Sequence, residues 1–325
     1  MRPRVLLLAK YAGTDHDVEN AAVIKEHAQY HYELEKALSE KCDVIPSNNL
    51  SDIESFRDSI DFVFPVFNNA GFVGAESFPA AQCERFGIPY LGARPSIRGV
   101  AEDKHLGKIL ATHAGVNTPA WVALRAPYDI TSATIEHINP PYFIKPRYGR
   151  NSEGISGDSI QHAPKSVIGY LHGLEGRLDD VIVEHAVSGT YCTVPAWMRE
   201  GSVEVLSPIM ESLDGPGPVT MEHKTHVATG LRREFSDNDE FNKRCESAVR
   251  SMYSLMEPLD FARFDFMYDY ENNDLEFLEA NVCCSLSKRS TFYMAVRERH
   301  DISYDEFIAV IFNESLARQT RGNQR

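Results

Sequence analysis

Residues 261–281 read FARFDFMYDYENNDLEFLEAN and decide the fold of the last third of the chain. Apolar and polar residues alternate on both sides of the ENN triplet, so the stretch predicts two strands joined by a tight turn. Side chains alternate between the two faces of a strand, which puts Arg263 and Asp265 on one face. Glu279 and Asn281 occupy the matching positions of the partner strand. Four polar groups therefore converge on one face of the predicted hairpin.

Two interpretations of this face stay open from the residues alone. Carboxylate and amide oxygens are ligands that Mg2+ accepts, usually with phosphate oxygens and water completing its shell. Asp265, Glu279 and Asn281 could therefore hold a metal ion. Acidic residues on a hairpin are equally typical of the solvated outer face of an antiparallel sheet.

A second segment places a lysine at the end of a buried strand. Residues 142–146 read YFIKP, and the polar stretch RYGRNSEG follows over 147–154. Backbone N–H groups of such a loop can cover phosphate oxygens beside Lys145, although exposed loops of this composition are common. Neither the Gly-x-Gly-x-x-Gly pattern nor the Walker sequence occurs in the chain, which argues against dinucleotide-binding and P-loop folds.

The order of elements predicts an α/β protein that is α+β in part. The first part has a strand over 4–10, a helix over about 17–41, a strand over 60–67, a helix closing near Gly87 and a short strand over 89–91. This βαβαβ order is typical of a parallel sheet.

Further along the chain the same patterns predict a mixture of strands and helices. We expect a helix over 96–115, strands over 121–124, 142–145 and 152–156, a helix over 164–174, a polar loop over about 212–236, and helices over 239–256 and 304–317. The last eight residues are polar, and we expect them to be frayed.

Composition excludes several classes of function. The 325 residues carry a formal charge of -14, which argues against nucleic acid or an anionic membrane surface as a partner. No apolar stretch approaches the roughly 20 residues that span a bilayer, and the N-terminus shows no small-residue cleavage site, so we expect a cytoplasmic protein. The chain has six cysteines and no C-x-x-C pair, which predicts free thiols.

Taken together and in order, these segments resemble the ATP-grasp superfamily and, within it, the D-alanine–D-alanine ligases. The resemblance runs over nearly the whole chain. The matching segments are 13–18, 90–92, 103–104, 145–146 with the loop that follows, 183–184, 188–189, 222–224, 263–265 and 278–281. The resemblance implies an ATP-grasp fold with an N-terminal parallel-sheet domain over 1–95, a central lid domain over 96–180 and a C-terminal magnesium domain over 181–325.

The resemblance also implies how the nucleotide and its metal are bound. Lys104 and Lys145 would hold the ATP phosphates, and Glu184 would meet the adenine amino group at a hinge. The remaining nucleotide contacts would be Ser152, His185, Val187, Lys224 and Asn281. Two Mg2+ ions, with Mn2+ as an alternative, would be held by Asp265, Glu279 and Asn281.

The implied catalytic residues are Arg263, Lys224, Asp15 and Ser290. Lys224 would contact the transferring phosphoryl group, and Arg263 would stabilise the tetrahedral intermediate and orient the second substrate. Ser290 would lie near the carboxylate of that substrate, and Asp15 near the ammonium of the first amino acid.

The activity that the resemblance implies joins a carboxylate to an amine with ATP. The carboxylate of a small amino acid or amino-acid derivative attacks the γ-phosphate to give an acyl phosphate, and an amine then displaces phosphate. Positioning and charge neutralisation are what such a reaction asks of a protein. The resemblance also implies a homodimer.

Four departures from the family pattern surround the amino acids rather than the nucleotide. Residues 67–76 replace the family's His-Gly and Gly-Glu-Asp-Gly segments, residues 282–285 replace Ser-Pro-Gly, residues 151–152 replace paired serines, and Thr225 replaces a tyrosine. These changes favour a relative with another substrate over literal D-alanyl-D-alanine synthesis. A cyclising ligase resembling the one that makes D-cycloserine stays open, as does a catalytically silent ATP-binding module, although every predicted magnesium ligand is present.

Overall fold

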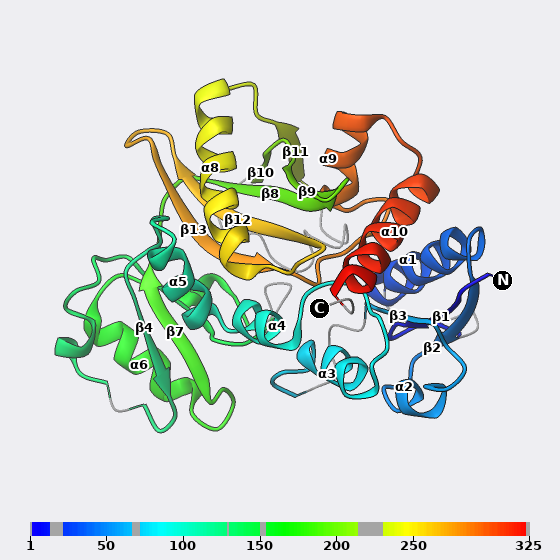
Figure 1. Ribbon diagram of the computed structural model, residues 1–325. Coiled ribbons are helices and arrows are strands. Elements are labelled where there is room, and N and C mark those ends of the chain that lie inside the picture. The colour runs from blue at the N-terminus through cyan, green and yellow to red at the C-terminus, as the bar shows by residue number, and fades with distance from the viewer. Residues whose placement is uncertain are drawn as a thin grey trace.

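The computed structural model describes residues 2–13, 22–66, 72–128, 130–149, 154–213 and 230–322. Three sheets succeed one another along the chain, and Figure 1 shows the C-terminal sheet lying between the other two. The first sheet is parallel and the other two are antiparallel. The predicted class, α/β with an α+β part, is confirmed.

The N-terminal sheet has the order β2-β1-β3. Its strands are β1 (Arg4–Leu8), β2 (Asp43–Ser47) and β3 (Phe62–Pro65), and its helices are α1 (Ala22–Ser39), α2 (Asp52–Ser55) and α3 (Ser77–Phe86). β1 and β3 are apolar runs that are buried almost throughout, as strands covered on both faces must be.

Two details of this region differ from the prediction. β2 was not predicted, because its five residues include Pro46 and show no clear alternation of apolar and polar side chains. It lies at the edge of the sheet, where a proline is tolerated. The strand expected over 89–91 is a single parallel bridge between Tyr90 and Val63.

Two helices lead into the middle of the chain where one was predicted over 96–115. They are α4 (Pro95–Glu102) and α5 (Lys104–His113). The break lies at Asp103, whose backbone is extended and whose side chain accepts hydrogen bonds from the N–H groups of His105 and Leu106. Asp103 is thus the N-cap of α5, and it sets Lys104 at the start of that helix.

The central sheet is antiparallel in the order β4-β7-β5-β6. Its strands are β4 (Trp121–Arg125), β5 (Tyr142–Pro146), β6 (Ile160–Gln161) and β7 (Asp180–His185), with the short helices η1 (Ser132–Ile135) and η2 (Gly157–Ser159) between them. Helix α6 (Pro164–Leu174) packs on the sheet through Val167 and Leu171. The predicted strand over 152–156 is wrong in its described part, because 154–156 are not in a strand and β5 pairs with β6 instead.

Strand β7 belongs to the central sheet, since it pairs with β4 on one side and β5 on the other. The boundary expected at residue 180 would separate this strand from its own sheet. We propose that the central region ends after His185 instead, while the division into three domains stays a prediction.

The C-terminal sheet is antiparallel in the order β11-β10-β8-β12-β13, and β9 pairs with the second half of β8. Its strands are β8 (Thr190–Arg199), β9 (Ser202–Val205), β10 (Ile209–Leu213), β11 (Leu231–Phe235), β12 (Phe261–Asp269) and β13 (Asp274–Asn281). Helix α8 (Asp239–Met256) covers one face with Val249 and Met252. The loop predicted over 212–236 is wrong at both ends, where β10 and β11 lie.

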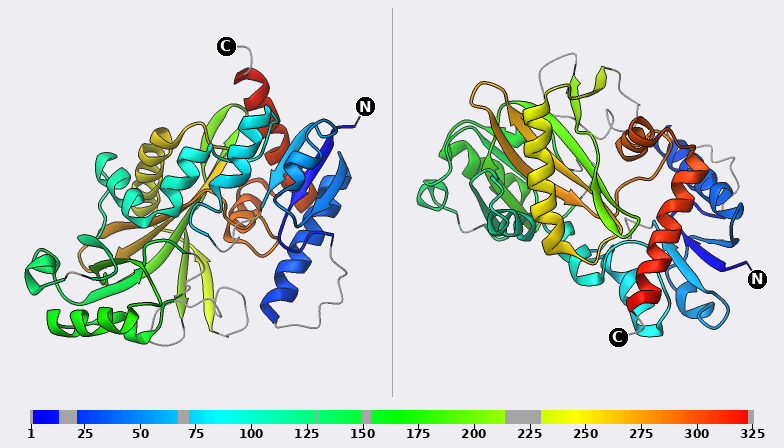
Figure 2. Two further views of the ribbon diagram at one scale, coloured as in Figure 1. Left: turned by 90° about the horizontal axis from the view of Figure 1, so that it is seen from below. Right: turned by 45° about the horizontal axis from the view of Figure 1, so that its top comes forward.

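The last two helices join the C-terminal sheet to the N-terminal one (Figure 2). α9 (Thr291–His300) was not predicted, and α10 (Tyr304–Gly322) continues through residues that we expected to be frayed. Arg318 pairs with Asp260 at 2.5 Å, and Phe312 packs edge-to-face on Phe62 of β3 with ring centroids 5.0 Å apart. This shared core fixes α1 beside the C-terminal sheet.

In the described part of the chain no helix is long and apolar enough to cross a bilayer. All six cysteines are free thiols, as predicted. Burial raises the pKa of Cys42 to about 11 and that of Cys83 to about 12, which disfavours the reactive thiolate at both positions.

Candidate active site

The β12–β13 hairpin forms as predicted and brings four polar side chains together. Arg263 is the pairing partner of Asn281, and Asp265 is the partner of Glu279. The register shifts only after Asp265, so the predicted common face is intact where these residues lie. The face is not solvated, because Asp265 is fully buried.

Asp265 accepts four hydrogen bonds from its surroundings. Oδ1 accepts from Arg263 Nε at 2.9 Å and from the Thr193 hydroxyl at 2.8 Å. Oδ2 accepts from Arg263 Nη2 at 2.8 Å and from Asn281 Nδ2 at 3.0 Å. Burial alone would lower the pKa of Arg263, but the Asp265 carboxylate holds that pKa well above its usual range. The pair is therefore a fixed, two-pronged ion pair.

A second charged cluster lies in the central sheet, where Glu184 of β7 contacts two lysines. Its Oε1 lies 2.6 Å from Lys145 Nζ, and its Oε2 lies 2.8 Å from Lys108 Nζ. All three side chains are buried. Lys108 was not among the residues predicted from the sequence, although it stands four residues after Lys104 in α5 and so occupies the same helix face.

Burial and charge act in opposite directions on this cluster. Burial alone would raise the pKa of Glu184, but Lys108 and Lys145 together hold that pKa below its ordinary value. Burial lowers the pKa of Lys108, and Glu184 offsets part of that shift. With both lysines protonated, one carboxylate faces two cations, so the cluster carries one positive charge that a phosphate oxygen would neutralise.

Lys104 lies beside the acidic hairpin, at the start of the helix that carries Lys108. Its Nζ donates to the Gly149 carbonyl at 2.8 Å and lies 4.0 Å from Glu279 Oε2. The preceding residue, Asp103, accepts two hydrogen bonds from Arg147, at 2.8 and 2.6 Å. Burial would raise the pKa of Asp103, but the Arg147 guanidinium and its hydrogen bonds hold it below its usual range. The start of α5 is thereby tied to the segment that follows β5.

The segment after β7 crosses from the central sheet to the C-terminal sheet. Val187 lies in this connection, and His185 Nδ1 lies 2.8 Å from the Asn139 carbonyl. Gly189 has φ +149°, and a Cβ there would collide with the Tyr268 carbonyl. Glu184, His185 and Val187 thus lie where the two antiparallel sheets meet, as a nucleotide site between sheets requires.

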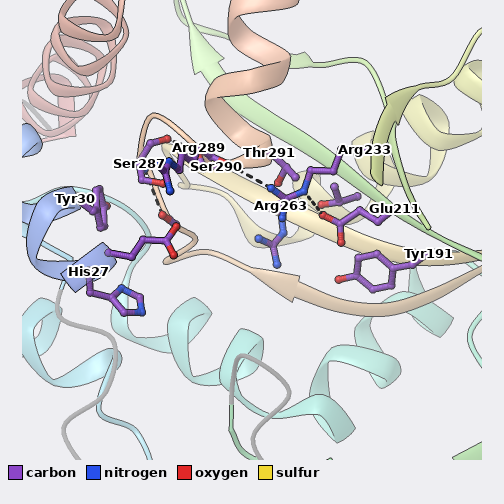
Figure 3. A pocket seen from close by; sticks show the side chains of 13 residues that line it. His27, Tyr30, Tyr191, Glu211, Arg233, Arg263, Ser287, Arg289, Ser290 and Thr291 are labelled. Carbon is purple, nitrogen blue, oxygen red and sulfur yellow. Dashed lines mark hydrogen bonds and ion pairs between the residues drawn. The ribbon is translucent and has the colours of Figure 1, made fainter. Parts of the chain in front are cut away.

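A cavity of about 130 Å³ lies between α1 and the C-terminal sheet (Figure 3). Helix α1 contributes Glu26, His27 and Tyr30. The sheet contributes Tyr191, Thr193, Glu211, Arg233 and Arg263, and the segment after β13 contributes Ser285, Ser287, Arg289, Ser290 and Thr291. The predicted residues Arg263 and Ser290 therefore meet in one cavity.

Ser290 has a structural task in addition to its place in the cavity. It is the N-cap of α9, with its hydroxyl oxygen accepting from Tyr293 N at 3.1 Å and its hydroxyl donating to the Ser287 carbonyl at 2.7 Å. The cap orients the Ser290 side chain at the cavity wall.

Three predicted residues, Asp15, Ser152 and Lys224, lie outside the described residues. The others fall into two groups, with Lys104, Lys145, Glu184, Glu279 and Asn281 on the side of the charged clusters and Ser290 in the cavity. Arg263 belongs to both groups, because it lines the cavity and holds Asp265.

Sequence reasoning missed most of the cavity. His27, Tyr30 and His31 recur at helical spacing inside a helix that was predicted, so a polar and aromatic stripe was visible there. Burial lowers the pKa of His27, so its imidazole is neutral at pH 7. Glu211 and Arg233 gave no comparable signal, since Arg233 stands in a stretch that was predicted to be a loop.

These features define a class of protein. Two antiparallel sheets meet at a hinge beside buried lysines, an acidic hairpin follows, and a cavity lies next to it. This arrangement is that of an ATP-grasp enzyme, in which a nucleotide is held between two sheets.

Comparisons with known proteins agree with this class. The family model "D-ala D-ala ligase C-terminus" matches residues 110–313. The D-alanine--D-alanine ligase of Clostridium perfringens is 24% identical over 281 residues, which cover 85% of this chain and 88% of that protein. A D-alanine--D-alanine ligase of Bordetella petrii is 25% identical over 265 residues, covering 76% and 74%.

Solved structures show the same fold. The D-alanine--D-alanine ligase of Bacillus anthracis complexed with ATP superposes with a TM-score of 0.77 at 19% identity, covering 98% of this chain and 99% of that one. The VanG D-Ala:D-Ser ligase of Enterococcus faecalis gives 0.72 at 16% identity, covering 97% and 100%. Because the sequence identities are below 20%, these superpositions show that the fold is shared and nothing more.

The chain belongs to the D-Ala-D-Ala ligase family. It is an ATP-grasp ligase that uses ATP, forms ADP and makes a carbon–nitrogen bond.

Proposed function

We propose that the chain activates the carboxylate of a small amino acid with magnesium and ATP and transfers the acyl group to the amine of a second amino acid. The observation that carries this proposal is the continuity of the site. Arg263 lines the cavity and holds Asp265, Asn281 bridges Asp265 and Glu279, and Glu279 lies 4.0 Å from Lys104. Groups suited to amino acids and groups suited to phosphates thus share one hairpin.

The hairpin residues fit Mg2+. Asn281 Nδ2 lies 3.0 Å from Asp265 Oδ2 and 3.4 Å from Glu279 Oε1, so the amide stands between two carboxylates. The orientation of an amide follows from its hydrogen-bond partners, and a reversed amide would present its oxygen to the same space. Two carboxylates and an amide oxygen are a suitable magnesium set. Mg2+, proposed as two ions, would neutralise charge on the phosphates when bound.

In the first step a carboxylate oxygen bonds to the γ-phosphorus and the bond to the ADP oxygen breaks. Lys104 and Lys145 are proposed to neutralise the phosphate oxygens, while Glu184, which also pairs with Lys108, holds Lys145 in place. Lys104 donates to the Gly149 carbonyl, so it can exchange that partner for a phosphate oxygen.

In the second step the amine nitrogen bonds to the acyl carbon, the carbon–oxygen bond to phosphate breaks, and the amine loses a proton. The guanidinium of Arg263 is proposed to stabilise the oxyanion that forms, because Asp265 fixes its orientation before the reaction begins. Ser290 is proposed to contact the carboxylate of the amine donor. We also propose that the reaction takes place in the cytoplasm, where ATP is available, and the homodimer stays a prediction.

The test is a panel of amino acids, singly and in pairs, with ATP and Mg2+. Phosphate release and product mass are measured, and Asp265→Ala is the blank. A pair that yields ADP, phosphate and a product lighter than its summed substrates by one water supports the proposal.

Three other outcomes would indicate a different function. A single compound that loses water indicates an intramolecular, cyclising ligase. Phosphate release that requires one amino acid, without any condensed product, indicates a carboxylate kinase. ATP binding without turnover across the panel counts against the proposed substrates and in favour of a silent module.

A further inference from the structure

Two arginines of the cavity have no part in the proposed chemistry. Arg263 is occupied by Asp265, but Arg233 and Arg289 face the same cavity from β11 and from the segment after β13. An amino acid offers one backbone carboxylate, for which Arg263 and Ser290 already suffice. The two further guanidinium groups therefore need a separate explanation.

Arg233 is held in a fixed orientation. It pairs directly with Glu211 across the β10–β11 ladder, and its Nε donates to Glu211 Oε1 at 2.8 Å. The Glu211 side chain is only 4% exposed and that of Arg233 is 17% exposed, so the pair is largely desolvated. Glu211 engages Nε and the Arg289 carbonyl lies near Nη1, which leaves Nη2 as the nitrogen that the guanidinium offers to a ligand. Arg233 Nη1 also lies 3.5 Å from the Arg289 carbonyl, which keeps these two residues close.

Arg289 adds a third guanidinium to the cavity lining. Its side chain is exposed, and within the part of the chain that the structure describes it forms no ion pair. The cavity lining contains three arginines and two glutamates, and His27 is neutral because burial lowers its pKa. Arg263 and Arg233 are each paired with a carboxylate, so Arg289 is the guanidinium of the lining that has no ion-pair partner among the described residues.

Among the described residues around the cavity none has an aliphatic side chain, and Tyr30 and Tyr191 supply aromatic surface. An anionic side chain would meet the guanidinium groups of Arg233 and Arg289 in addition.

We propose that the amine donor is an amino acid with a second carboxylate in its side chain, and that Arg233 and Arg289 bind that carboxylate. Glu211 positions Arg233 for this contact. The inference rests on the proposed ligase function and assigns the substrate class of its cavity.

The test compares acidic amino acids with their uncharged amides as amine donors. Aspartate is compared with asparagine, and glutamate with glutamine, in both enantiomers and with alanine as reference. We expect kcat/KM for the acid to exceed that for its amide by about 10- to 100-fold, the range expected for charge-assisted hydrogen bonds. Arg289→Gln should reduce this ratio about tenfold, mainly through KM.

A double variant tests Arg233, and a variant of a nearby exposed lysine serves as the control. Arg233→Gln alone leaves Glu211 buried without its partner, so it is combined with Glu211→Gln, and the double variant should bring the acid-to-amide ratio close to one. Lys288→Gln is the matched control, because Lys288 is exposed in the same segment, pairs with Glu33 and does not line the cavity. It should leave the ratio unchanged.

Failure of this inference is distinct from failure of the proposed function. Condensation of neutral amino acids with equal or better kcat/KM, or an acid-to-amide ratio that survives both arginine variants, overturns the inference and leaves the ligase intact. When no pair turns over, calorimetry with aspartate and glutamate decides. Binding that Arg289→Gln weakens about tenfold supports the inference, and absence of binding overturns it.

Discussion

The hairpin side and the cavity side of this site are built differently. On the hairpin side Asp265, Glu184 and their partners are buried, and each carboxylate is already matched by cations or hydrogen bonds. On the cavity side Arg233 is paired with Glu211, and Arg289 is exposed and forms no ion pair within the described part of the chain. We have proposed that the first side neutralises the phosphates of ATP and that the second recognises the amine donor.

Because the two sides are built differently, substitutions on them should have different effects. Changes on the hairpin side should abolish the reaction or destabilise the fold, because a charge is left buried without a partner. Changes on the cavity side should alter which substrate is used and leave the fold nearly unaffected.

The largest expected effect is that of Asp265→Asn. The substitution keeps the shape of the side chain but removes the charge that holds Arg263 and that would bind Mg2+. We expect kcat to fall by about a thousandfold or more. Steady-state phosphate release measures it.

A matched control for this variant is Glu271→Gln, which removes an exposed carboxylate from the turn of the same hairpin. It should retain the activity of the unchanged chain. A fall in activity shared by both variants would show that the hairpin responds to any loss of negative charge, and the special role of Asp265 would be lost.

Lys108→Met should destabilise the fold by about 3 kcal/mol. It removes one of the two cations that compensate the buried Glu184, and breaking a buried ion pair costs about 3 to 5 kcal/mol. Because Lys145 still pairs with Glu184, we expect the loss of stability to lie at the lower end of this range. Urea unfolding measures it, with the exposed Lys165→Met as control. A difference between the two variants below about 0.5 kcal/mol would refute the buried triad as a source of stability.

We expect the buried His31 to make the fold less stable in mild acid. Burial lowers its pKa to about 3, with a smaller contribution from the neighbouring His27. The unfolded chain takes up a proton below its ordinary pKa of 6.5 while the folded chain does not, so stability falls as the pH drops from 6.5 towards 3. At pH 5 the loss amounts to about 2 kcal/mol.

Urea unfolding at pH 7 and pH 5 tests this prediction with His31→Gln as the comparison. The variant should lose about 2 kcal/mol less than the unchanged chain over this interval. An identical loss in both would mean that His31 is protonated in the folded state, although its Nδ1 accepts a hydrogen bond from Tyr11 N at 3.2 Å.

The smallest expected effect is that of Ser290→Ala, which tests whether Ser290 only caps α9 or also contacts the substrate. Ser290→Ala should cost about 1 kcal/mol of stability through loss of the α9 cap and should also raise KM for the amine donor. Asn238 caps α8 in the same way and does not line the cavity, so Asn238→Ala should cost a similar amount of stability and leave KM unchanged. Equal KM values for the amine donor in the two variants would mean that Ser290 caps α9 and does not contact the substrate.

The parts that could be predicted from the sequence are those with local periodicity. Helices α6 and α8 were predicted with the bounds that they have, because apolar residues recur at helical spacing between clear end signals. The common face of Arg263, Asp265, Glu279 and Asn281 followed from strand alternation alone.

The parts that could not be predicted depend on contacts between distant segments. The break at Asp103 is stabilised by Arg147, and the partner of Lys145 and Glu184 in α5 is known only once that helix is packed on the central sheet. The cavity unites α1 with β10, β11 and the segment after β13, which lie far apart in the chain. The acidic hairpin was therefore visible in the sequence, and the cavity was not.

The most direct test of the proposed reaction follows an oxygen atom. The amino acid that supplies the acyl group is labelled with a heavy oxygen isotope in its carboxylate, and the phosphate formed with ATP and the amine donor is analysed by mass spectrometry. Transfer of one labelled oxygen to each phosphate is predicted, because the carboxylate oxygen becomes the bridging oxygen of the acyl phosphate. Unlabelled phosphate formed together with the condensed product would contradict the account.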